Sequence, residues 1–356
     1  MSRFTLPDFP WDLLAPYLQK ASKYPGGVID LSQGTPVDPT PQAIQIALQS
    51  ASNAPGYPLT TGSEELRGAI KKYCRDILGA QGDFDVLPTI GSKELVASLA
   101  YLLQRSKVFI PKIAYPTYKV GALLAHAQIT EVDINPQSWP ASDEKTLIWV
   151  NTPSNPTGYV HTIEEMEAAL AKRASGALLV SDECYFSFPD SKNPISFLSA
   201  AQGDFTRLIT VHSLSKRSNI AGYRSAFIAG DPELIGELLQ LRKHAGEIMP
   251  APIQRATVTA LADEEHVRQQ AERYRVRRSR AIPALIKAGF KIEHSQAGLY
   301  IWCSNGLSDW EQVSWFSERG IIVTPGSFYG EQGAKNIRIA MTATDQNITK
   351  FIERIS

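Results

Sequence analysis

Short apolar runs alternate with longer stretches of helical periodicity through the first two thirds of the chain. The clearest runs are rich in Val, Ile and Leu and read as buried strands at residues 107–111, 146–151, 177–183, 207–212 and 224–230. Strands that are apolar on both faces are typical of a largely parallel sheet, and the helical stretches between them would cover it. The pattern therefore predicts an α/β fold.

Three predicted helices begin with recognisable capping signals. Thr162 and Glu165 have the spacing of a capping box, in which each side chain accepts a hydrogen bond from the other residue's backbone N–H. Ser308 and Glu311 repeat this spacing. Asp231 precedes a proline, a residue that suits the first position of a helix. We expect a helix directly after each of these caps.

The pattern changes in the last third of the chain. A long charged helical stretch over residues 263–288 is followed by shorter apolar runs. These runs cover residues 299–303, 320–325 and 336–341. We expect residues 40–245 to form a large domain around the mostly parallel sheet, which lies between helices. Residues 1–39 and 246–356 would form a smaller α+β domain.

The composition is that of an ordinary globular chain. Of 356 residues, 43% are hydrophobic, and 36 basic residues balance 36 acidic ones. This neutrality argues against a nucleic-acid partner. No apolar stretch reaches the roughly 18 residues of a membrane span, so we expect no membrane association. Cys74, Cys184 and Cys303 are widely spaced, which favours reduced thiols and a cytoplasmic location.

Several common catalytic motifs are absent. The chain has no GxGxxG, GxxxxGK[ST], HExxH or GxSxG, which removes the usual signatures of nicotinamide dehydrogenases, P-loop NTPases, zincin proteases and α/β-hydrolases. The six histidines have no ligand spacing, so we expect no metal.

Polar residues gather where the predicted strands end. They are residues 151–155, Asp182 with Tyr185, and residues 213–216. In an open α/β sheet, ligands bind outside the carboxyl ends of the strands. A lysine with an acidic partner for a pyridine nitrogen is the pattern that holds pyridoxal 5′-phosphate (PLP), so these residues together suit that cofactor.

At these positions the sequence resembles the fold-type I PLP-dependent enzymes of the class I/II aminotransferase family. The matching motifs are Ser-Leu-Ser-Lys at 213–216, Ala-Gly-Tyr-Arg at 221–224, Asn-Thr-Pro-Ser-Asn-Pro-Thr-Gly at 151–158, Asp-Glu-Cys-Tyr at 182–185 and Asn-Ile-Arg-Ile-Ala at 336–340. They occur in the family's order, and the resemblance spans residues 34 to 340. It implies PLP as cofactor and amino acids and keto acids as substrates.

The resemblance implies roles around the cofactor ring. Lys216 would bind PLP covalently and then shuttle the proton of the reaction. Asp182 would pair with the pyridinium nitrogen, and Tyr185 and Asn155 would hydrogen-bond the phenolic oxygen. Tyr115 would stack on the ring, with a simple core aromatic as the alternative.

A free lysine titrates at about 10.4 and is a poor base at neutral pH. Arg224 and Arg217 are the cations near Lys216 in the sequence, and they would disfavour its charged form.

The phosphate group needs cations and hydrogen-bond donors. Ser92 and Lys93 open a predicted helix, so backbone N–H groups at the helix start would face the anion. Ser213, Ser215 and Arg224 would complete this site. A solvated residue in the first helical turn is the alternative for Lys93.

The substrate carboxylate needs a cation, and Arg338 fits because it alternates with apolar residues on a predicted strand. An exposed arginine on an edge strand is the alternative. By resemblance, Asn155 would also contact the substrate, and Gly34 would let the backbone approach it. Tyr57 matches a family tyrosine that reaches the phosphate of the neighbouring subunit, which implies a homodimer.

Among class I/II aminotransferases, the chain looks most like bacterial N-succinyldiaminopimelate aminotransferases of lysine biosynthesis. Its length, Gly-Ser-Lys-Glu at 91–94 and Ser-Lys-Arg-Ser-Asn at 215–219 carry this likeness. Such an enzyme moves an amino group between glutamate and N-succinyl-2-amino-6-ketopimelate, with 2-oxoglutarate as the other keto acid. The sequence identifies no cation for the distal carboxylate: Arg217, Arg242 and Lys243 are available but read as surface residues.

Other functions remain open at this point. An aspartate, aromatic or other aminotransferase, or a PLP-dependent C–S lyase or decarboxylase, would share every cofactor residue. A transcription regulator with an aminotransferase-like domain would need a DNA-binding extension, which the sequence does not show. A binding module without catalysis would have no need of the lysine, aspartate and tyrosine together.

Overall fold

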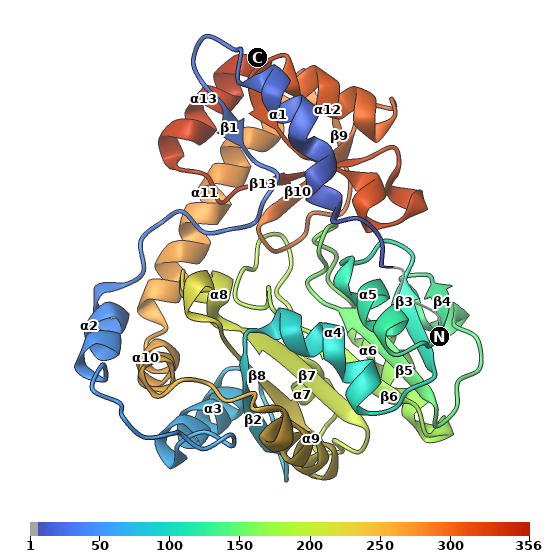
Figure 1. Ribbon diagram of the computed structural model, residues 1–356. Helices are drawn as coiled ribbons and strands as arrows, with labels where there is room; N and C mark the ends of the chain where they lie inside the picture. Colours follow the sequence, from blue (N-terminus) through green and yellow to red (C-terminus); the bar gives the residue numbers. More distant parts are fainter. Residues whose placement is uncertain (1–5) are drawn as a thin grey trace.

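The computed structural model describes residues 6–356, and its largest element is a seven-stranded sheet (Figure 1). In spatial order the strands are β2 (Asp85–Ile90), β8 (Ser225–Gly230), β7 (Leu208–Ser213), β6 (Leu178–Asp182), β5 (Thr146–Asn151), β3 (Lys107–Pro111) and β4 (Gln128–Val132). All neighbours run parallel except β8, which is antiparallel to both β2 and β7. The predicted α/β fold with a mostly parallel sheet is confirmed.

The reversal at β8 follows from the short connection before it. Only the single turn α8 (Leu214–Arg217) and a 3₁₀ turn (Ala221–Tyr223) separate β7 from β8. A parallel return would need a crossover of a dozen residues or more, usually with a full helix.

Helices cover both faces of this sheet. On one face, α4 (Ser92–Leu102), α5 (Thr117–Leu124) and α9 (Pro232–Ala245) share a core with Leu147 and Trp149. On the other, α2 (Gln42–Ser50), α3 (Glu64–Asp76), α6 (Ile163–Ala171), α7 (Phe197–Ala200) and α10 (Ala251–Ala262) share a core with Ile148 and Val150. Successive residues of β5 are therefore buried on opposite faces, which is why its sequence is apolar at every position from Leu147 to Val150.

The smaller part of the molecule has its own core and sheets. A four-stranded antiparallel sheet has the order β12 (Thr324–Pro325), β13 (Ile337–Ala340), β10 (Tyr300–Ser304) and β9 (Lys291–Ile292). Next to it, β1 (Ile29–Asp30) pairs with β11 (Ile321–Ile322). The helices here are α1 (Ala15–Ala21), α11 (Glu265–Lys287), α12 (Asp309–Ser317) and α13 (Asp345–Ile355). In Figure 1, α11 runs from beside α10 up to this smaller part.

The predicted helix starts are confirmed. Thr162 and Ser308 each form a complete capping box, with Glu165 and Glu311 as partners. The Asp231 side chain accepts a hydrogen bond from the backbone N–H of Glu233 at the start of α9.

The packing of α10 bears on where the large domain ends. A boundary at residue 245 assigns α10 to the smaller domain, but Ala256 and Ala260 of α10 are buried in the core that covers the large sheet. Helix α10 also packs against α2 and α3. We therefore propose that the large domain extends through residue 262. None of the helices in residues 6–356 is long and apolar enough to span a membrane.

Candidate active site

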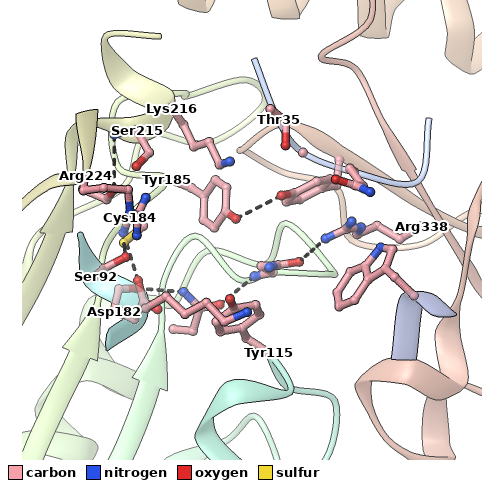
Figure 2. Close-up of a pocket in the computed structure, with 18 of the residues that line it drawn as sticks. Thr35, Ser92, Tyr115, Asp182, Cys184, Tyr185, Ser215, Lys216, Arg224 and Arg338 are labelled. Carbon is pink, nitrogen blue, oxygen red and sulfur yellow. Dashed lines mark hydrogen bonds between the residues drawn. The ribbon is translucent and has the colours of Figure 1, made fainter. Parts of the chain in front are cut away.

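A cavity of about 330 Å³ lies beyond the carboxyl ends of β5, β6 and β7, where the smaller part meets the large sheet. It is lined by all but one of the residues that the sequence singled out: Gly34, Ser92, Lys93, Tyr115, Asn155, Asp182, Tyr185, Ser213, Ser215, Lys216, Arg224 and Arg338. Figure 2 shows the side chains converging on this space from both parts of the molecule. The exception is Tyr57, which is 99% exposed and outside the cavity.

Lys216 enters the cavity from α8, the turn that directly follows β7. Burial, with contributions from Arg338 and Arg224, lowers its pKa to about 8. Arg224 thus acts as expected. Arg217 instead points toward the α10–α11 junction, where it pairs with Glu264 and donates to the Ala260 carbonyl. A lysine with this pKa is a usable nucleophile near neutral pH.

Asp182 ends β6 with a fully buried carboxyl group. One carboxyl oxygen accepts a hydrogen bond from the Cys184 backbone N–H at 3.1 Å, and the other accepts one from the Tyr118 hydroxyl at 2.7 Å. Burial raises the pKa of Asp182, although the bonds from Cys184 and Tyr118 act in the opposite direction. No Lys or Arg among residues 6–356 forms an ion pair with it. A bound positive group would therefore stabilise its ionised form.

Asn151 at the end of β5 holds the next loop in place. Its side chain donates to the Asp182 carbonyl at 2.8 Å and accepts from the Asn155 N–H at 2.6 Å. The Asn155 side-chain oxygen then accepts a hydrogen bond from Arg338 at 2.9 Å. This chain of contacts joins the large sheet to the strand that carries Arg338.

Arg338 on β13 is a buried guanidinium, 2% exposed, whose charge has no carboxylate partner among the described residues. It donates to the Ser32 carbonyl at 2.6 Å, and its Nε has no partner. A buried charge without a counter-ion is costly. The geometry therefore suits an incoming carboxylate.

The opposite end of the cavity suits a phosphate. Ser92 is the first residue of α4, so its neighbouring N–H groups and the positive helix end face the cavity. Gly91 precedes it with φ of +77°, and a Cβ there would lie 2.2 Å from an Arg224 nitrogen. Only glycine allows the Arg224 guanidinium to lie this close to the helix start.

Lys93 is the second residue of α4 and is exposed, which agrees with its reading as a solvated residue of the first helical turn. Its Nζ is 5.4 Å from the centre of the Phe9 ring, and both residues line the cavity. The other cations considered for a distal carboxylate either form ion pairs with glutamates or lie outside the cavity. Arg217 is 4% exposed, and Arg242 is fully buried between Glu94 and Glu247, so the reading of both as surface residues is wrong. Lys243 is exposed on α9, as expected.

Sequence reasoning missed several lining residues. Phe9, Trp11, Gln33 and Thr35 come from the N-terminal segment, which has no periodicity to mark it. Cys184 lies inside a recognised motif but received no role. Tyr300 also lines the cavity, with its hydroxyl 3.0 Å from that of Tyr185.

The parts of this cavity match the parts of PLP. Lys216 offers an amine for its aldehyde, and buried Asp182 lacks the positive partner that a pyridinium N–H would provide. Arg224 and the start of α4 offer charge and donors for its phosphate. The residue set therefore fits this cofactor.

Comparison with known proteins agrees with this geometry. The family model for aminotransferase class I and II matches residues 26–355. The chain is 45% identical to a probable aminotransferase of Mycobacterium tuberculosis, over 99% of this chain and 86% of that protein. It is also 45% identical to the 4-dedimethylamino-4-oxo-anhydrotetracycline transaminase OxyQ of Streptomyces rimosus, over 99% of each chain. A solved structure of a probable N-succinyldiaminopimelate aminotransferase from Thermus thermophilus matches 98% of this chain and 99% of its own, with a TM-score of 0.85 and 27% identity.

Proposed function

The chain belongs to the class I and II aminotransferases, which use PLP, and we propose that it transfers an amino group from N-succinyl-LL-2,6-diaminopimelate to 2-oxoglutarate. The products would be N-succinyl-2-amino-6-ketopimelate and glutamate, and the reverse direction would serve lysine biosynthesis. One observation carries the choice of substrate. The cavity has a buried cation for the α-carboxylate, Arg338, and a second cation at its mouth, Lys93.

Lys216 would move the proton of the reaction. When bound, PLP supplies an electron sink for the charge that develops on the substrate's α-carbon. Burial, with the charges of Arg338 and Arg224, lowers the pKa of Lys216 to about 8, which makes its neutral amine more accessible near neutral pH than that of a free lysine. The Lys216 Nζ would serve as the general base that holds the α-proton during the transfer.

Asp182 and Tyr185 would affect how readily the cofactor ring accepts negative charge, each by contacting a different side of the ring. The Asp182 carboxylate would pair with the protonated pyridine nitrogen, and the Tyr185 hydroxyl would donate a hydrogen bond to the phenolic oxygen. The Tyr118 hydroxyl, 2.7 Å from Asp182, keeps that carboxylate oriented. Tyr115 and Asn155 would position the ring, and Ser92, Ser213, Ser215 and Arg224 would hold the phosphate.

Arg338 would bind the α-carboxylate of either substrate. Its guanidinium is already fixed by bonds to Ser32 and Asn155, so little side-chain freedom is lost on binding. The unpaired buried charge makes a carboxylate the favoured ligand.

Lys93 would select for a distal acidic group. Its ammonium has no ion-pair partner among the described residues and lies against Phe9 at the mouth of the cavity. We therefore assign Lys93 to the substrate side chain rather than to the phosphate. Losing such a charge-assisted contact costs about 1.5–3 kcal/mol, or roughly 10- to 150-fold in kcat/KM.

A second candidate substrate is a large aromatic ketone. Phe9, Trp11, Tyr115 and Tyr300 give the cavity an aromatic lining, against which a fused ring system would stack. OxyQ, the transaminase whose name gives a 4-oxo-anhydrotetracycline as substrate, is 45% identical to this chain. The aromatic lining is the observation that favours this alternative.

We also propose that the enzyme works as a cytoplasmic homodimer. Tyr57 is 99% exposed, and Val37, Ile46 and Leu59 are large apolar residues exposed on nearby segments of the chain. A second copy covering this surface would bring Tyr57 to the partner's phosphate site. The three cysteines are free, which suits a reducing compartment.

A substrate panel tests the proposal. With 2-oxoglutarate as acceptor, succinylated diaminopimelate should exceed free diaminopimelate, alanine and phenylalanine in kcat/KM by at least about tenfold. Lys93→Met should remove most of this preference while leaving alanine turnover within about threefold. Lys119→Met, which removes an exposed lysine from α5, is the matched control.

Other outcomes would point to a different substrate or a different reaction. If phenylalanine or a fused-ring ketone is preferred, the lysine-pathway reaction is wrong and the aromatic candidate stands. Release of ammonia or thiol without a keto acid would identify a lyase instead.

A further inference from the structure

Tyr300 lies between the carboxylate-binding and cofactor-binding ends of the cavity. It is the first residue of β10, pairs with Ala340 of β13 and is 3% exposed. Its ring covers the Arg338 guanidinium, with 4.0 Å between Cζ and the ring centre. Its hydroxyl lies 3.0 Å from the Tyr185 hydroxyl, and this contact is the dashed line that leaves the labelled Tyr185 in Figure 2.

The Tyr300 hydroxyl is confined on a second side by the backbone of Gly34. A Cβ added at Gly34 would lie 2.0 Å from this oxygen, so a side chain there would displace the tyrosine. The rings of Tyr300 and Tyr185 also meet edge to face at 5.4 Å. The position of the hydroxyl is therefore fixed before any ligand binds.

We propose that Tyr300 is a positioning residue that couples Arg338 to Tyr185, so that a carboxylate bound at Arg338 changes the protonation of the cofactor held by Tyr185. The inference rests on the proposed function. Either hydroxyl could be the donor in this contact. A cation over the ring draws electron density from it and makes the Tyr300 hydroxyl a better donor, so we take Tyr300 as the donor and Tyr185 as the acceptor. Tyr185 then keeps its own hydrogen for the phenolic oxygen of PLP.

This arrangement fixes the direction of the effect. A bound carboxylate neutralises Arg338, weakens the donation from Tyr300 and so weakens the bond from Tyr185 to the phenolic oxygen. The bound cofactor then holds its proton to higher pH. Arg338 also contacts Asn155, which gives a second route, so Tyr300 carries part of the coupling.

The other titratable groups around the pair stay neutral in the relevant range. Burial raises the pKa values of Tyr115, Cys184, Tyr274 and Tyr329. Burial raises the pKa of Tyr185, and the positive charge of Arg338 acts in the opposite direction. Once Lys216 is joined to the cofactor, Arg338 is the charged side chain among residues 6–356 that faces the two hydroxyls.

Absorbance titration of the PLP-bound enzyme tests the inference without relying on turnover. Succinate, a dicarboxylate that cannot react, should raise the midpoint pH of the cofactor's absorbance change. Tyr300→Phe keeps the ring over Arg338 and removes the hydroxyl. It should raise the midpoint of the free enzyme by about 0.4–1 pH unit and reduce the succinate-induced shift to about half or less.

Two further variants make the test specific. Tyr329→Phe is the matched control, because its ring also contacts Arg338, at 5.1 Å, whereas among residues 6–356 the bond to Tyr185 comes from Tyr300. It should titrate like the wild type. In a Tyr185→Phe background, Tyr300→Phe should no longer move the midpoint, because the coupling runs through that hydroxyl.

The possible results separate this inference from the proposed function. A midpoint and succinate shift unchanged by Tyr300→Phe, or an equal change in the Tyr185→Phe background, would overturn the coupling while leaving the aminotransferase intact. A purified protein that binds no PLP would overturn the assigned site as a whole.

Discussion

Lys216 shows how burial changes the chemistry of one side chain. Its pKa of about 8 arises first from burial and then from the charges of Arg338 and Arg224. Both causes act before the cofactor binds, since they come from the protein alone. The free amine of this lysine is therefore prepared to react at neutral pH.

Incorporation of PLP into the apoprotein should follow this pKa. The neutral amine is the reactive form, so the rate of cofactor binding, followed by absorbance, should rise with pH and level off above about 8. Replacing Arg338 with Met removes a cation that lowers the pKa, and the plateau should move to higher pH. A wild-type rate that climbs steadily to pH 10 would contradict the lowered pKa.

Asp182 and Tyr118 should affect turnover to different degrees. A carboxylate about 4 Å from a pyridinium is worth roughly 4 kcal/mol at an effective dielectric of 20, part of which water would recover in a variant. Asp182→Ala should therefore slow transamination by about two to three decades in single-turnover absorbance experiments. Tyr118→Phe removes one neutral-to-charged hydrogen bond and should cost about ten-fold. Near-normal turnover of Asp182→Ala with PLP bound would refute the assigned role.

At the scale of elements, α11 connects the segment before α2 with the turn that carries Lys216. Asp38 accepts two hydrogen bonds from Arg277, at 2.9 Å each, and one from Gln270. Gln270 in turn accepts a bond from Asn219, three residues after Lys216. Asp38 closely follows Gly34 and Thr35, so one helix fixes both walls of the cavity.

Breaking this network should damage stability and substrate binding together. Asp38→Ala leaves the 1%-exposed Arg277 without one of its carboxylates, and we expect a loss of about 3 kcal/mol in the free energy of unfolding by urea. Because the displaced segment faces the substrate, KM should rise more than the Kd for PLP. Glu272→Ala on the same helix, which breaks an exposed pair with Arg275, should change neither quantity appreciably. Equal effects of the two substitutions would rule out the network.

At the scale of the whole molecule, the cavity depends on two separately packed cores. Asp182 ends strand β6 of the large sheet, and Lys216 and Arg224 lie between its strands β7 and β8. Arg338 and Tyr300 lie on strands β13 and β10 of the smaller, four-stranded sheet. Substrate and cofactor would thus be held from opposite sides. In our proposal the second subunit also contributes a residue to this site, its Tyr57.

Mixing two inactive variants tests the proposed composite site. If Tyr57 serves the partner's site, a mixed dimer of Tyr57→Ala and Lys216→Ala protomers contains one site with neither substitution, and mixing should restore activity. If Tyr57 acts within its own subunit, every site of that dimer carries one substitution and mixing restores nothing. Exchange should be checked by sedimentation, and full activity of a monomer at nanomolar concentration would exclude a dimeric site.

The sequence by itself determined the elements and the chemistry at their ends. Runs such as 147–150 are apolar at every position, which indicates burial on both faces, and the Thr162 and Ser308 caps mark helix starts within a few residues. Because parallel strands end at one edge of a sheet, Asn155, Asp182 and Lys216 were expected to share a site. All of these signals come from residues close together in the chain, because the side-chain spacing of helices and strands follows from local backbone geometry.

Tertiary structure decided which distant side chains meet. Tyr118 is bonded to Asp182, Tyr300 to Tyr185, and Lys93 lies against Phe9, although 64, 115 and 84 positions separate these pairs. The packing of α10 in the core of the large sheet and the antiparallel direction of β8 are likewise set by tertiary structure. Such contacts leave no periodic trace, because they depend on how independently formed elements pack together rather than on the spacing of residues along any one of them.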